Sequence, residues 1–381
     1  MRLSTRKGFA LPIAIGSMIV IGMILAGVFF AATQENRAGR NTITQERAFR
    51  AAEFGLNAVY NKWDNPTFNA LPNGGTAIKT YKDTARGTWT DELRVTRLNT
   101  NTFWLVSTGL AGSTISQARH RTGLVVRLTQ PQINFLAALT VHGTTQLGGS
   151  SYTTGEDTPP TSWNCPPPGA EQPGIAVSNV STVITSGCTA FSCIDGSPQV
   201  LSTNAVNDTN TFFTYGPDAN WTTLTAMADL TYAGNNTITG VSPNLNPDGT
   251  CRYDAGNWGD PRRLTPTGAC ESYYPIIYFS GQSTTNLISG GMGQGILLVD
   301  GDLTVNGGFQ WYGPVIVRGR LATQGTGGHF NGAVMAANVD FDQNTVLGNA
   351  TITYSSCAIN AALLGAGSPK RLKYRSWAEM F

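Results

Sequence analysis

The sequence predicts a mainly β fold that follows one long N-terminal α-helix, with a right-handed parallel β-solenoid interrupted by an irregular, disulfide-bearing insertion. An uncharged and mostly apolar run extends from Phe9 to Gln34. A strand pattern repeats at an offset of 18 residues in the last third of the chain. Only 13% of the 381 residues are charged and 44 are Gly, which suits an exported body with many tight turns and argues against a helical bundle.

The net charge of +2 comes from the first residues of the chain. Arg2, Arg6 and Lys7 are three of the 25 Lys and Arg residues, so the remainder holds 22 basic against 23 acidic side chains. A body with that balance has no general attraction for nucleic acid, and we expect no nucleic-acid partner. The three His residues lie far apart in the sequence, which weakens the case for a catalytic or zinc site.

The apolar run is long enough to cross a membrane. Phe9 to Ala32 holds 24 residues, which span about 36 Å of helix at about 1.5 Å per residue. A cleaved secretory signal has an apolar core of only about 7–15 residues. Positive charge precedes the run and the first acidic residue is Glu35. We therefore expect a single-pass anchor in the inner membrane, with the large body exported.

The residues around the start of this run carry a more specific signal. Arg6 to Pro12 reads Arg-Lys-Gly-Phe-Ala-Leu-Pro, a short basic leader that ends in Gly and precedes an apolar helix opened by Phe. This resembles type IV prepilins, in which a membrane peptidase cuts after the Gly and the new N-terminal Phe is N-methylated. The resemblance implies a leader at residues 1–8, cleavage between Gly8 and Phe9, and a transmembrane and assembly helix at 9–62. An ordinary uncleaved anchor is the alternative.

One position departs from the pattern of major pilins. The fifth residue of the mature chain would be Ile13, where major pilins have a Glu that pairs with the N-terminal amine of a neighbouring subunit. A lone carboxylate in apolar surroundings is unfavourable unless it is paired. In lacking this Glu, the chain resembles tip-located minor subunits, such as the K-type pseudopilin of type II secretion and PilX-type minor pilins. It favours a minor component over a bulk filament subunit.

The helix is expected to continue beyond the membrane. Ala48, Ala52, Leu56 and Val59 form one stripe at helical spacing, which indicates a face that packs on the rest of the body. The segment that holds this stripe is similar to the corresponding segment of PilX-type pilins, with Phe54 where Ala is usual. Pro66 marks the end of the helix.

Strand composition then predicts a pilin-like β segment at residues 66–130, with a hairpin turn between Asn99 and Thr102. Residues 117–121 form a small basic patch around His120, which we interpret as a solvated turn. A first solenoid rung is expected at 135–150. A Cys-containing insertion follows at 151–285, and within it Asn220 to Leu230 is expected to form a short helix.

The solenoid itself is predicted for residues 286–360. Residues 297–305 align with 315–323, and looser copies begin at Val334 and Leu139. Repeats of this length with period-2 alternation and Gly or Asn between strands are typical of a parallel solenoid, because neighbouring rungs must supply each other's core. We expect the following alternate side chains to fill the interior: Leu297, Val299, Leu303, Val305, Val315, Val317 and Leu321.

Charged residues on the rungs do not indicate catalysis. Asp300 and Asp302 align with Arg318 and Arg320, so we expect opposite charges to pair between neighbouring strands. No Ser/His/Asp grouping or metal-ligand spacing is present, and we expect neither an enzyme nor a cofactor. Residues 361–381 end in a basic and aromatic tail, which we expect to cover the open end of the solenoid, with docking of a partner as the alternative.

Six cysteines in an exported body suggest disulfides, with fifteen possible connectivities. Pairing of near neighbours is the simplest arrangement and leaves the first cysteine for the last. The candidates are Cys165, Cys188, Cys193, Cys251, Cys270 and Cys357.

Together these features predict a minor pilin or pseudopilin that primes, caps or decorates a type IV pilus or a type II secretion pseudopilus. The resemblance implies three partners: the prepilin peptidase, the inner-membrane platform, and other pilins through the N-terminal helix. It also implies display on a cell-surface filament after assembly. Two alternatives are an adhesin that binds a surface or glycan through the solenoid, and a polysaccharide-active β-helix enzyme on a membrane anchor.

Overall fold

The computed structural model describes residues 10–83, 88–113, 116–217, 219–338, 344–372 and 376–380. The chain divides into two compact units. The first comprises Met1–Lys62, Asn73–Arg127 and Arg371–Phe381, and the second comprises Trp63–Pro72 and Leu128–Lys370. The second unit is therefore inserted into the chain of the first.

The first unit is built on helix α1, which runs from Ala10 to Asn61 over 52 residues. At about 1.5 Å per residue this is about 78 Å of continuous helix. An ion pair between Glu46 and Arg50 (2.9 Å) supports the helix at i,i+4 spacing. The helix ends before Asp64, which caps the next short helix, α2 (Asn65–Phe68), in the second unit. The predicted helix at 9–62 is confirmed for its described residues.

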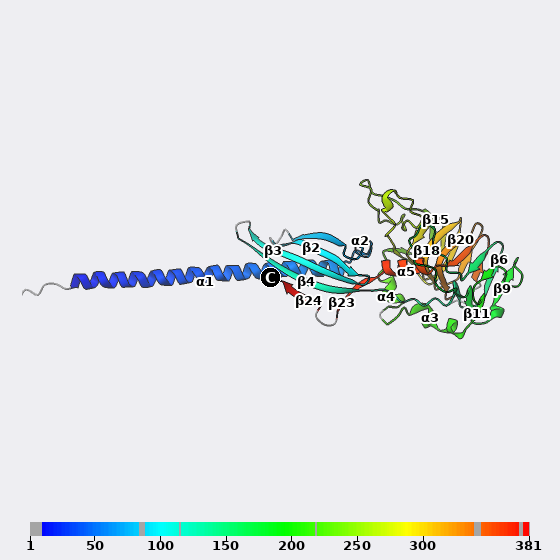
Figure 1. Ribbon diagram of the computed structural model, residues 1–381, viewed down its shortest axis with the longest axis horizontal. Helices are drawn as coiled ribbons and strands as arrows, with labels where there is room; N and C mark the ends of the chain where they lie inside the picture. The colour runs from blue at the N-terminus through cyan, green and yellow to red at the C-terminus, as the bar shows by residue number, and fades with distance from the viewer. Residues whose placement is uncertain are drawn as a thin grey trace, which may run out of the picture. The chain divides into compact units, whose positions relative to one another are not determined.

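An antiparallel sheet lies along the C-terminal half of α1 (Figure 1). β2 and β3 form the hairpin predicted at Asn99–Thr102, and β24, from the end of the chain, pairs with β4. β23 belongs to the same sheet. The strands are β1 (Thr76–Asp83), β2 (Thr88–Asn99), β3 (Thr102–Ser113), β4 (Ser116–Thr129), β23 (Ser368–Arg371) and β24 (Trp377–Met380).

The predicted small-residue stripe is the contact between α1 and this sheet. Ala48, Ala52 and Val59 are completely buried, and Leu56 nearly so. Opposite them, Gly109 on β3 lies so close that an added Cβ would overlap the carbonyl oxygen of Ala48 and the amide nitrogen of Ala52. Small residues on both sides allow this close approach of helix and strand backbones.

The second unit is a parallel solenoid with three faces, and several strands bend from one face to the next. Face 1 contains β12 (Leu230–Ala233), β14 (Ile276–Ser280), β16 (Ile296–Val299), β5 (Leu139–Val141), β8 (Ile175–Val177) and β11 (Val200–Ser202), with the C-terminal parts of β18 (Phe309–Val317) and β20 (Gly328–Ala336). Face 2 contains β13 (Asn236–Val241), the first part of β15 (Thr285–Gln294), β17 (Asp302–Asn306), β19 (Leu321–Thr323), β21 (Asn344–Val346), β6 (Thr145–Gly148) and β9 (Val183–Ser186). Face 3 contains the end of β15, the first parts of β18 and β20, β22 (Thr351–Tyr354), β7 (Tyr152–Thr154) and β10 (Ile194–Asp195).

The register of these strands confirms the predicted repeat. Leu297 pairs with Val315, and Val315 pairs in turn with Val334. All seven side chains predicted to fill the interior are buried in the same core cluster. At one corner, Gly313 and Gly332 are stacked with positive φ (129° and 152°), and a Cβ on Gly332 would overlap the carbonyl oxygen of Gly313. Gly is therefore required where successive rungs turn this corner.

Face 1 is buried on both sides, which explains its continuous apolar strands. Its outward side chains, such as Ile296, Leu298 and Ile316, form a second core with residues from outside the solenoid. The covering elements include a 3₁₀ turn (Asn204–Asn207), α3 (Thr209–Phe213), α4 (Trp221–Thr225) and α5 (Ser356–Gly365). α4 lies within the short helix predicted at 220–230, and Asn220 caps it.

The stacking order of the rungs differs from their order in the chain. We expected residues 151–285 to interrupt the solenoid, but β7 to β11 and β12 to β14 pair in parallel with the other rungs. β5, β6 and β7 stack on β20, β21 and β22. The chain therefore enters the solenoid in the middle, winds to one end, returns outside along 203–229 and winds back from the other end.

Internal loops, rather than the tail, cover the two ends of the solenoid. At the β12 end, Trp258 is fully buried against Phe279, Phe309 and Trp311, and its carbonyl accepts a hydrogen bond from Gln294 N (2.8 Å) as a further strand would. At the other end, the loop between β9 and β10 packs Phe191 on the interior core. We expected the tail to do this, but its residues 377–380 pair with β4 because that strand offers a free edge in the first unit.

Candidate functional site

The first half of α1 is an apolar helix without a partner among the described residues. From Leu11 to Phe30 every large apolar side chain is exposed, including Ile13 at 61%. This helix is long and apolar enough to cross a membrane. This half of α1 holds 13 of the 24 large apolar side chains that are exposed in the described chain, and it is our first candidate for a functional site.

The polar groups of this segment are satisfied within the helix. Ser17, the one polar side chain between Ala10 and Ala32, donates its hydroxyl to the carbonyl oxygen of Ala14 (2.9 Å). The Thr33 hydroxyl likewise donates to the carbonyl oxygen of Phe30 (2.8 Å). Such back-bonding lowers the free energy of placing a hydroxyl in hydrocarbon. The segment can therefore be buried in lipid, or among other helices, without leaving a side-chain donor unpaired.

The predicted cleavage residues Gly8 and Phe9 lie outside the described residues. The helix is already regular at Leu11, Pro12 and Ile13. Proline is tolerated there because the amides of the first helical turn have no intrahelical acceptor.

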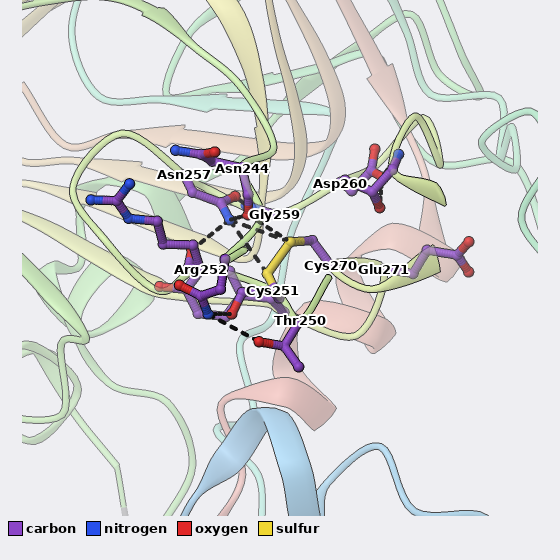
Figure 2. The surroundings of a disulfide bond; sticks show 12 residues. Asn244, Thr250, Cys251, Arg252, Asn257, Gly259, Asp260, Cys270 and Glu271 are labelled. Atoms are coloured by element: carbon purple, nitrogen blue, oxygen red, sulfur yellow. Dashed lines mark hydrogen bonds between the residues drawn. A yellow bond between two sulfur atoms is a disulfide. The ribbon is translucent and has the colours of Figure 1, made fainter. Parts of the chain in front are cut away.

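The structure pairs all six cysteines. The pairs are Cys165–Cys357, Cys188–Cys193 and Cys251–Cys270. Figure 2 shows the last of these, where Asn257 points its amide at the bond. Its Nδ2 lies 3.3 Å from each sulfur atom and donates to the carbonyl oxygen of Arg252 (2.7 Å). Asn257 is fully buried, so the disulfide and this amide hold the loop that inserts Trp258 into the solenoid.

The aligned acids and arginines pair across neighbouring rungs as predicted. Arg318 Nη1 lies 2.8 Å from Asp300 Oδ1, and Arg320 Nη2 lies 3.6 Å from Asp302 Oδ2. The other oxygen of Asp300 accepts a hydrogen bond from the Tyr278 hydroxyl (2.6 Å). Burial, with this bond to a carboxylate, raises the pKa of Tyr278 to about 12. Both oxygens of Asp300 are therefore engaged in stabilising the solenoid.

The Arg318 guanidinium also lies over the rings of Phe213 (5.3 Å) and Trp221 (5.7 Å). These rings belong to α3 and α4 of the outer segment. Arg318 thus attaches that segment to face 1 by cation–π contact. The alignment of acids and arginines predicted the ion pairs, but it held no signal for the aromatic partners.

The basic patch at 117–121 lies on strand β4 rather than in a turn. His120 Nε2 lies 3.1 Å from Glu379 Oε1 on β24, and the ring packs edge-on against Phe49 of α1. These residues belong to an open groove of about 800 Å³ in the first unit. Its lining is mixed in charge and polarity and comprises Thr42, Gln45, Glu46, Phe49, Arg119, His120, Arg121, Glu379 and Met380.

Within the described part of the chain, no group of three or more His, Cys, Asp or Glu side chains is arranged to hold a metal ion. The most buried carboxylates serve backbone groups instead. Asp157 accepts hydrogen bonds from the amides of Gly169 and Ser356, and Asp260 accepts them from the amides of Leu264 and Thr265.

No protein-family model matches the chain, and no curated protein matches it. Among solved structures, the chain is similar to the competence-associated pilin ComZ from Thermus thermophilus. The identity is 12% and the TM-score 0.23, with 88% of this chain and 97% of that chain covered.

Proposed function

We propose that the protein is a minor pilin-like subunit, a structural component of a type IV pilus or of a type II secretion pseudopilus. One observation carries the proposal: a single helix is exposed and apolar over its first half and packed on an antiparallel sheet over its second. The Ala48–Ala52 contact with Gly109 holds the second half. The first half is left to bury its apolar surface in a membrane and then among the helices of other subunits.

The residues before this helix support processing by a prepilin peptidase. Gly8 and Phe9 follow three basic residues and precede the apolar run, as in the leaders of type IV prepilins. The mature chain would begin at Phe9, held in the inner membrane by α1 until a platform complex passes it to the filament. The body would then lie outside that membrane, where disulfides form.

A minor position follows from Ile13 and from the size of the second unit. Ile13 has no carboxylate that could pair with the N-terminal amine of a neighbouring subunit. The subunit therefore does not depend on a neighbouring subunit that is already in place. Leu128 to Lys370 form one inserted body, which is more easily accommodated at the end of a filament than within a close-packed shaft. We therefore expect few copies per filament and a role in priming, capping or decorating it.

Immunogold labelling of filaments from the native organism tests this position. An antibody against the second unit should label few sites, mostly at filament ends, and deletion of the gene should reduce the number of filaments. Even labelling along the shaft would contradict the proposal. Ile13→Glu should increase the label in the shaft, whereas the matched variant Ile15→Glu, which places the same charge two residues further on, should not.

A further inference from the structure

The solenoid is continuous in space but not in sequence. Strands β5 to β11 form one arm, the N-arm, and strands β12 to β22 form the other, the C-arm. The arms meet where β5, β6 and β7 pair with β20, β21 and β22, and we name this junction the seam. Residues 203–229, which run outside the strands, are the covalent link between the arms.

The seam joins residues that are far apart in the chain. His142 and Ala337, which are in contact across it (3.1 Å), are 195 residues apart. Within the C-arm, by contrast, Leu297 pairs with Val315, only about 18 residues away. Bringing distant segments together loses more conformational entropy than closing short loops. The seam should therefore form after the C-arm and open before it, unless something holds it closed.

Two contacts beside the seam hold it. Asp157, which follows β7, accepts hydrogen bonds from the amide (2.8 Å) and the hydroxyl (2.6 Å) of Ser356, which follows β22. Asp157 is only 5% exposed. The next residue, Cys357, is bonded to Cys165, which follows Asp157 in the N-arm. The same two rungs are thus joined by buried hydrogen bonds and by a covalent bond between residues 192 apart in sequence.

We propose that the seam is a redox-controlled latch, closed by the Cys165–Cys357 disulfide. With the bond formed, the two arms behave as one body. A dithiol reductant opens the latch by supplying two electrons and two protons, which yields two protein thiols and the cyclic disulfide of the reductant. The seam then opens while the C-arm keeps its own strands paired. This inference does not depend on the filament role and stands or falls separately.

Hydrogen exchange of the full chain in detergent, read by mass spectrometry, tests the latch. The reporters are amides bonded across the seam: His142 to Ala336, and Tyr152 to Ala350. In the double variant Cys165→Ser/Cys357→Ser these should exchange at least about tenfold faster, since local opening sets their rate. The amide of Leu303, bonded to Arg320 inside the C-arm, should change by less than about twofold.

The matched control removes a disulfide that does not cross the seam. Cys251→Ser/Cys270→Ser should leave the seam amides at the wild-type rate. Equal acceleration of seam and C-arm amides would overturn the proposal, because the bond would then support the whole unit. Unchanged seam amides would also overturn it.

A second perturbation keeps the test decisive if the cysteine variant does not fold. Asp157→Asn leaves every disulfide in place but sets an amide against the groups of Ser356 or Gly169. It should accelerate the same seam amides when dithiothreitol is present, and much less without it. Equal acceleration under both conditions would show that the disulfide does not hold the seam.

Discussion

Replacing Gly109 with alanine perturbs the contact that joins α1 to its sheet. Gly109 lies on β3 directly opposite Ala48 and Ala52, both completely buried. The added methyl group would overlap the carbonyl oxygen of Ala48 and the amide nitrogen of Ala52. These are backbone atoms of a regular helix and cannot rotate away, so helix and strand must separate.

The size of the effect follows from that rigidity. Adding a methylene to a well-packed core destabilises by about 1–3 kcal/mol where side chains can adjust. The atoms that the new methyl group meets are backbone atoms of a helix, which cannot adjust in this way. We therefore expect a destabilisation at the upper end of this range, about 3 kcal/mol. The first unit comprises 128 residues, and an unfolding entropy of about 2.1 cal/mol/K per residue converts this loss into a fall in Tm of about 11 °C.

Differential scanning calorimetry of the full chain in detergent measures this loss. The transition of the first unit should move to lower temperature in Gly109→Ala, and that of the second unit should stay in place. Gly39→Ala is the matched control, because nothing lies within 4 Å of the position its Cβ would take. It should be neutral or stabilising by up to about 1 kcal/mol. If Gly109→Ala melts with the wild type, α1 is not packed on β3 as described.

Three further predictions concern the second unit. Trp258→Ala should destabilise this unit by about 3–5 kcal/mol in urea denaturation. Tyr253→Ala is the control, because Tyr253 is 55% exposed, and it should have little effect. Equal effects would contradict the role of Trp258 as the cap of the β12 end. Burial lowers the pKa of His329, so the unfolded chain binds the proton first. The free energy of unfolding should therefore fall as the pH drops from about 6.5 through that lowered pKa. His329→Gln should remove this part of the pH dependence of the free energy of unfolding. An unchanged pH dependence would show that His329 is not its source. Peptide mapping under non-reducing conditions should find no free thiol, and any other connectivity would contradict these pairs: Cys165–Cys357, Cys188–Cys193 and Cys251–Cys270.

Local patterns in the sequence were sufficient to predict α1 and the core rungs. The spacing of Ala48, Ala52, Leu56 and Val59 reflects the helical period and so identifies the buried face. The offset of 18 residues reflects the length of one rung and so identifies which residues stack. Both signals lie within a short stretch of chain, where the physical constraint is the geometry of a single element.

The seam and the end caps could not be predicted in this way. The repeat aligns Leu139 with Val334, but nothing near Leu139 indicates that these two copies are stacked neighbours, because the choice of a parallel partner depends on which strand edges stay free after the rest has folded. Strands β8 and β11 are only three residues long and lack the repeat pattern. The Trp258 cap and the pairing of β24 with β4 depend on the same long-range geometry.

The candidate functional residues also differ in whether a local stretch of sequence reveals them. The basic residues before Gly8, the apolar run from Phe9 and the apolar side chain at Ile13 are local features that the sequence displays directly. The latch residues carry no local signal: Asp157 and Ser356 are 199 residues apart. The cysteine count indicated that disulfides form but left their connectivity open, since the spacing of cysteines does not determine which of them meet in space.

The mass of the N-terminal peptide of the mature protein tests the central claim most directly. We predict that protein isolated from membranes or filaments begins at Phe9, with a methylated amine, and that Gly8→Glu leaves the full-length precursor in the membrane. A mature chain that begins at Met1, or at a residue beyond Ala32, would contradict a processed pilin-like subunit that is anchored and assembled through α1.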